Sequence, residues 1–202
     1  MSTDAIAFAG PALVARGDLP TVARALKEAD ATRGPLVFDA VTSEPIELDL
    51  RGNLATVLAR ARAVEDATMA RIAVATVGDD GPRGPGRPRL GVQGREVTLL
   101  PRHWDWLAAQ PGGASAALRR LVDIARVTNA GKDRRRRGQE AAYRFMSAML
   151  GDQPNFEEAT RALFANDRPR FIVLSKPWPR DLRTHARELA DAAFTTDSAS
   201  DA

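Results

Sequence analysis

The first third of the chain alternates short apolar runs with apolar positions at helical spacing. The runs AIAFAG at residues 5–10 and ALVARG at residues 12–17 predict two strands that meet at a Gly-Pro turn. After the second run, Pro20 suits the first turn of a helix. The apolar positions that predict this helix share one face: Val22, Leu26 and Ala29. This segment is therefore expected to fold as strand, strand, helix.

The same order of patterns follows once more. The runs PLVFDA at residues 35–40 and PIELDL at residues 45–50 predict two further strands, and Asn53 suits the N-cap of a helix after them. The apolar stripe of this helix consists of Leu54, Val57, Leu58 and Ala61. The expected fold class is thus α+β, with an N-terminal ββαββα layer whose helices cover one face of a mainly antiparallel sheet.

The period of the pattern changes three times in residues 95–130. Residues 96–100 are a β-favouring run, and Pro101 ends this run and begins a helix. A Pro-Gly-Gly sequence stops the helix at Gln110, and Ser115 is the expected N-cap of the next helix. The second helix has an apolar stripe at Leu118, Leu121, Val122 and Ala125. A central strand-helix-helix segment is therefore expected.

The C-terminal part is expected to be helical, with Asn155 as the N-cap of its middle helix. Its apolar stripes are Ala142, Phe145, Met146, Met149 and Leu150; Phe156, Leu163 and Phe164; and Leu182, Ala186, Leu189 and Ala190. The expected division of the chain is an α+β domain at 1–75, a basic Gly/Pro-rich linker or arm at 76–94, the strand-helix-helix segment at 95–130, a helical region at 131–194 and a disordered tail at 195–202.

Several classes of function are disfavoured by what the sequence lacks. With no cysteine and only two histidines, the chain offers no disulfide, thiolate zinc site or histidine metal cluster. We find no apolar run of membrane-spanning length, no signal-peptide pattern, no phosphate-binding glycine loop and no nucleophile elbow. Asp18, Asp39 and Asp49 follow apolar runs, where acids are usually solvated turn residues. We therefore expect a cytoplasmic protein that is not an enzyme and needs no cofactor, no metal and no membrane.

The positive charge is concentrated in the middle of the chain. The formal net charge is +3, but residues 81–144 alone hold 14 Lys and Arg against 5 Asp and Glu. The segments on either side are both net acidic. Clustered cations attract polyanions and release their counterions. This asymmetry favours a nucleic-acid partner, while a solvated basic surface is the alternative with the same composition.

The sequence VTLLP before the first central helix and GGASAALRRLV at the second resemble the ribbon-helix-helix family of bacterial DNA-binding proteins. The resemblance covers Arg95 to Val127, and it implies that two chains pair their strands into a ribbon that enters the major groove. It further implies that Arg95 or Thr98 faces the DNA and that the helix capped by Ser115 begins at a phosphate. The departures are a short first helix and outward strand positions that are not uniformly polar. A plain helical hairpin packed on the N-terminal sheet is the alternative.

The sequence PGRPR at residues 85–89 resembles the core of an AT-hook. In such an arm proline keeps the backbone extended and arginines lie in the narrow minor groove of A·T-rich DNA. The resemblance implies that Arg83, Arg87, Pro88 and Arg89 form a minor-groove arm. An ordinary Gly/Pro/Arg linker is the alternative.

Over nearly its full length the chain is similar to a bacterial family of unknown function, through LVFD, LDLRG and EAAYRFMSAMLGD. Taken together, these patterns predict a DNA-binding protein, a transcription regulator or a nucleoid-associated type, that binds double-stranded DNA, A·T-rich DNA included, as a homodimer. The residues expected at the DNA are Arg83, Arg87, Pro88, Arg89, Arg95, Thr98, Ser115, Arg119, Arg120, Arg134, Arg135, Arg136 and Arg137. The alternative is a non-enzymatic interaction or regulatory module whose basic segment meets an acidic partner.

Overall fold

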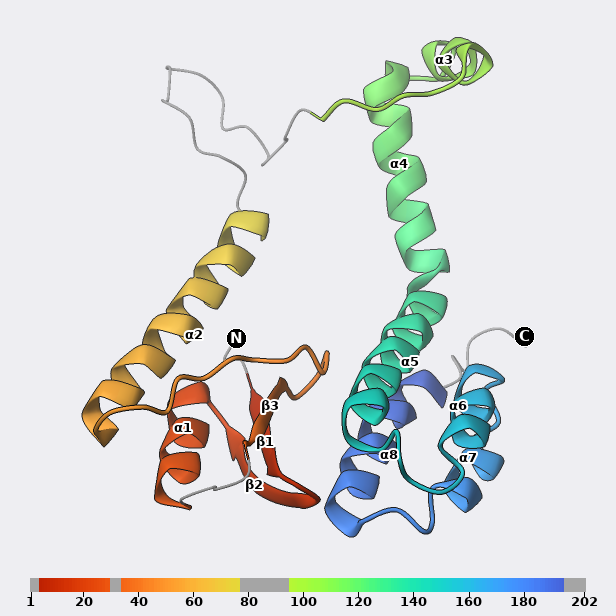
Figure 1. Cartoon of the computed structure of the whole chain (residues 1–202). Helices are drawn as coiled ribbons and strands as arrows, with labels where there is room; N and C mark the ends of the chain where they lie inside the picture. The colour runs from red at the N-terminus through yellow and green to blue at the C-terminus, as the bar shows by residue number, and fades with distance from the viewer. Residues whose placement is uncertain (1–3, 30–33, 77–94, 195–202) are drawn as a thin grey trace. The chain divides into compact units, whose positions relative to one another are not determined.

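The structure is a computed structural model that describes residues 4–29, 34–76 and 95–194. The chain forms two compact units, the first made of residues 1–71 and 133–202 and the second of residues 72–132. Its elements are β1 (Ala5–Ala9), β2 (Ala12–Gly17), α1 (Leu19–Glu28), β3 (Leu36–Asp39), α2 (Leu54–Thr76), α3 (Pro101–Ala108), α4 (Gly113–Thr128), α5 (Ala130–Met149), α6 (Phe156–Phe164), α7 (Arg168–Leu174) and α8 (Arg180–Phe194) (Figure 1).

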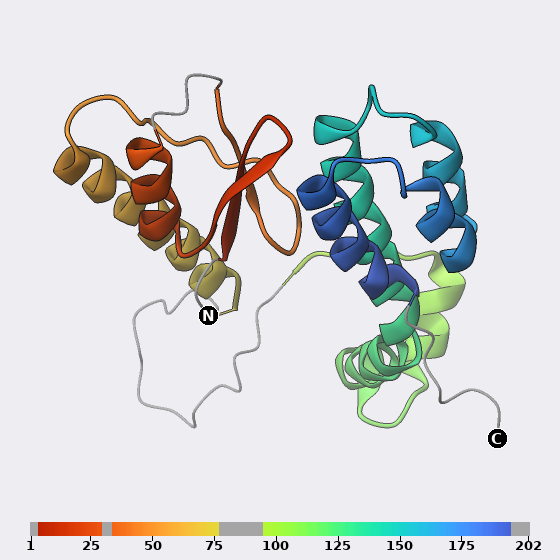
Figure 2. The same cartoon turned by 90° about the horizontal axis from the view of Figure 1, so that it is seen from below.

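The first unit is organised around β1, the central strand of an antiparallel sheet with the order β2-β1-β3. The two strands predicted at the N-terminus are confirmed, and Gly10 adopts a φ of +57° in the turn between them. Successive side chains of β1 enter two different hydrophobic clusters: Ile6 and Phe8 belong to one, Ala5 and Ala7 to the other. All four are buried because α1 covers one face of the sheet and the C-terminal helices cover the opposite face (Figure 2).

The second predicted hairpin is wrong. Residues 45–50 lie outside any strand, apart from one isolated bridge between Phe38 and Pro45. Pro45 has no N–H to donate, and after Ile46 donates to the carbonyl of Val37 at 2.8 Å the segment leaves the edge of β3. Its apolar residues are half-buried against the cluster of α1 and α2. The alternation of apolar and polar residues at 45–50 therefore reflects half-burial of a segment that forms no hydrogen-bonded strand pair. The N-terminal elements follow the order ββαβα, and the predicted α+β class is confirmed.

The stripes predicted for the C-terminal helices form the larger core. The predicted residues that are buried there are Ala142, Phe145, Met146, Leu150, Leu163, Leu182, Ala186, Leu189 and Ala190. The ring of Phe145 packs on that of Phe8 with centroids 5.3 Å apart, which joins α5 to the sheet. An ion pair between Arg16 of β2 and Glu188 of α8, at 2.9 Å, joins the same two layers at their edge.

Two details of the predicted C-terminal helices are wrong. Phe164 was expected on the buried side of α6 but is 51% exposed, because it is the last residue of the helix. The Phe164 ring lies beside the ring of Tyr143 of α5. Asn155 occupies the N-cap position but makes no side-chain cap, since its φ is +64° and its Nδ2 donates instead to the carbonyl of Leu174 at 3.2 Å. The side chain thus ties α6 to the end of α7.

Helices α5 and α8 lie close together at Gly138. A Cβ atom placed on this residue would lie 2.6 Å from the backbone nitrogen of Ala193 and 3.0 Å from the carbonyl carbon of Ala192. Ala190 and Ala193 are themselves fully buried, so α8 has no room to move away. The contact depends on the absence of a side chain at position 138.

We expect Gly138→Ala to lower the free energy of unfolding by about 1–3 kcal/mol, because the clash with backbone outweighs the gain in helix propensity of roughly 1 kcal/mol. For a chain of this size each kcal/mol corresponds to a loss of about 2–4 °C in Tm. Thermal and urea denaturation measure the change. Gly34→Ala is the matched control, since a Cβ there meets nothing within 4 Å, and it should leave stability nearly unchanged. Equal stability of both variants would contradict the close packing.

His185 of α8 is buried between the sheet and α5, with its ring edge-on to Phe145 at a centroid distance of 4.6 Å. Neither ring nitrogen has a hydrogen-bond partner within the described part of the chain. Burial lowers the pKa of His185 below its ordinary value of 6.5, and the Glu188 carboxylate, 3.7 Å from Nδ1, opposes this effect only in part. Arg16, which is paired with Glu188, lowers the pKa further. The folded state therefore favours neutral imidazole.

We expect the stability of the protein to depend on pH through His185. Because the unfolded chain binds this proton more readily than the folded chain, the contribution of neutral His185 is complete above about pH 6.5 and is lost as the pH falls below it. Urea midpoints at pH 7.5 and pH 5.0 measure the loss. The variant His185→Phe keeps an aromatic ring in the core and should show a smaller difference between the two midpoints. If the urea midpoints of the wild-type protein and of His185→Phe differed by the same amount between pH 7.5 and pH 5.0, the loss of stability in acid would come from groups other than His185.

Candidate nucleic-acid interface

The predicted central helices are confirmed as a helical hairpin. Pro101 begins α3, as the sequence indicates, and α3 and α4 meet at Leu107 and Ala117, each 3% exposed. Gly112 and Gly113 form the turn with φ values of +84° and +73°, which L-residues with a side chain rarely adopt. Beside these glycines, the side chain of Arg120 donates from Nη2 to the carbonyl of Pro111 at 3.0 Å and so closes the turn.

The predicted cap at Ser115 is wrong. Helix α4 begins at Gly113 with Gly112 at the N-cap and no side-chain cap. Because both glycines tolerate the left-handed region, the helix begins three residues before the position that a serine cap would have given it. Ser115 therefore lies in the first turn, where its Oγ accepts from Nη2 of Arg119 at 3.0 Å. The two expected DNA-binding residues are adjacent on one side of α4.

The predicted strand before α3 is not formed in the single chain. Residues 95–100 lie outside any strand, and the sheet of the first unit contains only β1, β2 and β3 within the described residues. A strand needs a partner to supply its ladder, and none of the described segments pairs here. Arg95 and Thr98 are exposed in this irregular segment.

Helix α4 has two sides of different character. The resemblance to the ribbon-helix-helix family implies that Leu121 is a core position, but in the single chain Leu121 is 44% and Val122 is 54% exposed. The eight residues of α3 span about 12 Å and the sixteen of α4 about 24 Å, so α3 covers only the first half of α4. Arg119, Asp123 and Arg126 recur at i, i+4 and i+7 away from that stripe and are exposed.

The arginines of the hairpin segment carry charge that no carboxylate neutralises. Among the described residues, no ion pair involves Arg95, Arg102, Arg119, Arg120 or Arg126. By contrast, several exposed arginines of the C-terminal helices are paired with acids, as in the bond between Arg168 and Asp191 at 3.0 Å. The side of α4 that bears Arg119 and Arg126 is thus an exposed basic stripe, interrupted only by Asp123.

The Arg134–Arg137 run lies on α5, within the first compact unit, and its members differ in environment. Arg136 bonds to Asp133 at 3.1 Å and lies 4.0 Å from Glu140, so much of its charge is already balanced. Arg135 is half-buried, and its Nε has no hydrogen-bond partner within the described residues. Arg137 is exposed. The run is therefore not a uniform basic surface, which the sequence alone did not indicate.

Four of the residues expected at the DNA lie outside the described part of the chain: Arg83, Arg87, Pro88 and Arg89. The three acids set aside as turn residues all have local structural partners. Asp18 caps α1 by accepting from Thr21 N–H at 2.8 Å, and Asp39 accepts from Thr42 N–H at 2.7 Å. The guanidinium of Arg51, at 2.9 Å, lowers the pKa of Asp49 to about 2, with Arg60 contributing.

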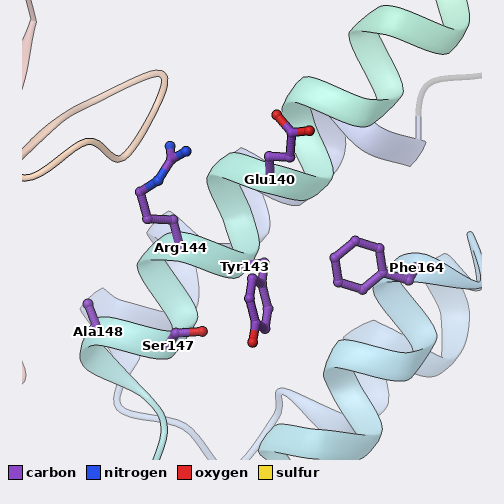
Figure 3. Close-up of a pocket in the computed structure, with 6 residues that line it drawn as sticks. All are labelled: Glu140, Tyr143, Arg144, Ser147, Ala148 and Phe164. Atoms are coloured by element: carbon purple, nitrogen blue, oxygen red, sulfur yellow. The ribbon is translucent and has the colours of Figure 1, made fainter.

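A shallow hollow of about 590 Å³ between α5 and α6 was not foreseen from the sequence (Figure 3). The residues that line it are Glu140, Tyr143, Arg144, Ser147, Ala148 and Phe164. The Tyr143 and Phe164 rings meet edge to face with centroids 5.8 Å apart, while the Arg144 side chain points away from them and donates to the Thr42 carbonyl. Tyr143 falls outside the core stripe of α5, which is the signal that could have marked it as exposed.

The described helices include none that is long and apolar enough to span a membrane. Within the same residues, no group of three or more His, Asp or Glu side chains is placed to hold a metal ion.

A family model described as "Uncharacterized protein conserved in bacteria (DUF2239)" matches residues 4–190. No curated protein and no solved structure matches the chain. The family match confirms the full-length similarity expected from the sequence.

We expect the two helix N-termini to respond differently to loss of a side chain. Asp18→Ala removes a carboxylate that accepts from a backbone N–H of α1 and should cost about 1 kcal/mol of unfolding free energy. Ser115→Ala removes no cap and should change stability by less than about 0.5 kcal/mol. Urea denaturation of both variants at pH 7.5 makes the comparison. A larger loss for Ser115→Ala than for Asp18→Ala would contradict the observed start of α4.

Proposed function

The chain belongs to this family of uncharacterized bacterial proteins, and we propose that it binds double-stranded DNA through the α3–α4 segment. The observation that carries the proposal is the exposed stripe on α4 with Arg119 and Arg126, which no carboxylate of the described chain pairs. A guanidinium binds two phosphate oxygens at once and gains free energy when counterions are released from the DNA. Such a stripe is therefore suited to a polyphosphate backbone.

The distribution of ion pairs favours the interpretation that the central arginines form a binding site for an anionic ligand over the interpretation that they are only a solvated basic surface. Arg161 and Arg170 of the C-terminal helices both pair with Glu158, so the cations there are balanced within the fold. The central segment has few acids to do the same, and the net positive charge of the chain arises from it. A segment that holds several exposed arginines and few acids to pair with them is suited to an anionic ligand.

Within this proposal α4 lies with its charged side against the duplex, since the major groove is wide enough to admit a helix. Arg119 is held by Ser115, and this bond reduces the rotamer freedom that a phosphate contact would otherwise have to restrict. The residues Arg83, Arg87, Pro88 and Arg89 extend the contact into the minor groove of A·T-rich DNA. A role in transcription regulation or nucleoid organisation would follow from such binding.

We expect the full chain to bind a labelled duplex of about 20 base pairs, A·T-rich or mixed, with strong salt dependence. With roughly six phosphate contacts, affinity should fall on the order of a thousandfold between 50 and 200 mM salt. The double variant Arg119→Gln/Arg126→Gln removes two contacts and should lower the slope of log affinity against log salt by about 2. Fluorescence anisotropy titrations at several salt concentrations measure both quantities.

The matched control is Arg161→Gln/Arg168→Gln, which removes the same charge from ion-paired arginines of the C-terminal helices and should leave the slope nearly unchanged. Asp123→Asn removes the acid within the stripe and should tighten binding. If both double variants lowered the salt slope of DNA affinity equally, binding would depend on the net charge of the chain and not on the α4 arginines. Absence of binding to any duplex at 50 mM salt would overturn the proposal and favour an acidic protein partner.

A further inference from the structure

Two polar contacts attach strand β2, which lies at an edge of the sheet, to helix α8. The backbone N–H of Leu13 donates to the Asp181 carboxylate at 3.0 Å, and the Arg16 guanidinium pairs with Glu188 at 2.9 Å. A shift of register between these two contacts leaves Val14 without a partner on β1, which is the pattern of a β-bulge. Side-chain contacts of this kind open more easily than a hydrogen-bonded ladder between strands.

His185 occupies the face of α8 that bears both of these acids. Asp181, His185 and Glu188 recur at i, i+4 and i+7, so they lie on one side of the helix. His185 is 3% exposed, and its ring lies 5.9 Å from that of Phe8 of β1 and 4.6 Å from that of Phe145 of α5, measured between centroids. The buried imidazole is therefore part of the layer between α8 and the hairpin of β1 and β2.

One carboxylate oxygen of Glu188 faces both His185 and Arg16. Oε2 of Glu188 accepts from Nη1 of Arg16 at 2.9 Å and lies 3.7 Å from Nδ1 of His185. These two charged groups, from α8 and β2, act on the imidazole, whereas β1 has no charged residue and α5 meets the ring with Phe145. Nε2 of His185 has no hydrogen-bond partner among the described residues. A protonated ring would thus share one carboxylate with a guanidinium and keep its second N–H without an acceptor.

We propose that His185, Glu188 and Arg16 form a proton-operated latch, which holds β2 on α8 at neutral pH and releases it in acid. With neutral imidazole, the Glu188 carboxylate is bound by Arg16 and the edge is closed. When the imidazole gains a proton, two cations compete for one carboxylate and a charged N–H is buried without a partner, which costs free energy. Separation of β2 from α8 admits water to the ring and removes both costs, while the ladder between β1 and β2 stays in place.

The latch opens as the pH falls, because its open form binds the proton more readily than its closed form. Burial lowers the pKa of His185 in the closed form below 6.5, and the Glu188 carboxylate offsets this effect only in part. If hydration in the open form restores the ordinary value of 6.5, the opening equilibrium increases by up to roughly thirtyfold between pH 7.5 and pH 5.0. Both elements belong to the first compact unit, so the latch does not depend on DNA binding.

Residue-resolved amide hydrogen exchange of the full chain, followed by NMR at pH 7.5 and pH 5.0, tests the latch. The Leu13 amide reports the opening directly, because its acceptor is the Asp181 carboxylate of α8. Its protection factor, corrected for the intrinsic exchange rate, should fall by about ten- to thirtyfold at pH 5.0. The Arg170 amide is the matched reference, since it also donates to a carboxylate, that of Asp167 at 3.0 Å, and its protection should stay nearly constant.

Three variants separate the parts of the latch. His185→Phe keeps an aromatic ring that cannot bind a proton, so the protection of Leu13 should be the same at both pH values. Glu188→Gln removes the ion pair with β2 and should lower the protection of Leu13 by about two- to fivefold already at pH 7.5. The matched control is Asp191→Asn, which breaks the exposed ion pair of the same helix with Arg168 and should leave Leu13 unaffected.

Three outcomes would overturn the latch. An equal loss of protection at Leu13 and Arg170 in acid would mean that the first unit loosens as a whole and not at the edge of β2. Constant protection of Leu13 between the two pH values would mean that no opening occurs. The same loss at Leu13 in His185→Phe as in the wild-type chain would assign the opening to the carboxylates. If circular dichroism shows that His185→Phe does not fold, His185→Gln, which also lacks a titrating side chain, provides the same comparison.

Discussion

The fold of the first unit depends on the burial of β1 from both faces. A strand of five residues with the sequence AIAFA has no polar position to place in water, so each face must find apolar cover. Ala5 and Ala7 face the small cluster under α1, where short side chains allow a helix to lie close to the sheet. Ile6 and Phe8 face the larger cluster built by the C-terminal helices. The two ends of the chain are thus joined through one strand.

This arrangement leaves the central segment without a share in either core. Neither hydrophobic cluster contains a residue from the described stretch 95–132, and the hairpin of α3 and α4 buries little beyond Leu107 and Ala117. Hydrophobic burial is the dominant favourable term in folding, so such a segment has apolar surface still to be covered. The same residues bear arginines without acid partners. The hydrophobic cores of the protein and its arginines without acid partners therefore lie in different parts of the chain.

The two parts differ in how some of their arginines are paired. In the first unit, arginines pair with acids across elements, as Arg16 does with Glu188 and Arg168 with Asp191, and these pairs are exposed enough that each adds little to stability. Their effect is to fix register between elements and to neutralise charge within the fold. In the hairpin, Arg119 bonds to the Ser115 hydroxyl and Arg120 to the Pro111 carbonyl, so within the described residues no acid neutralises their charge.

Much of the local structure follows from short-range pattern: the N-terminal hairpin, the start of α3 at Pro101, the Asn53 cap and the core stripes of α5 and α8. Which apolar positions are covered depends on tertiary packing. Residues 45–50 alternate like a strand but border a helix cluster, and Leu121 lies in a helical stripe but extends past the end of α3. Ser115 looks like a cap but follows two glycines that begin the helix earlier. The reason is that periodicity records which side of an element is apolar, whereas burial depends on the length and position of another element.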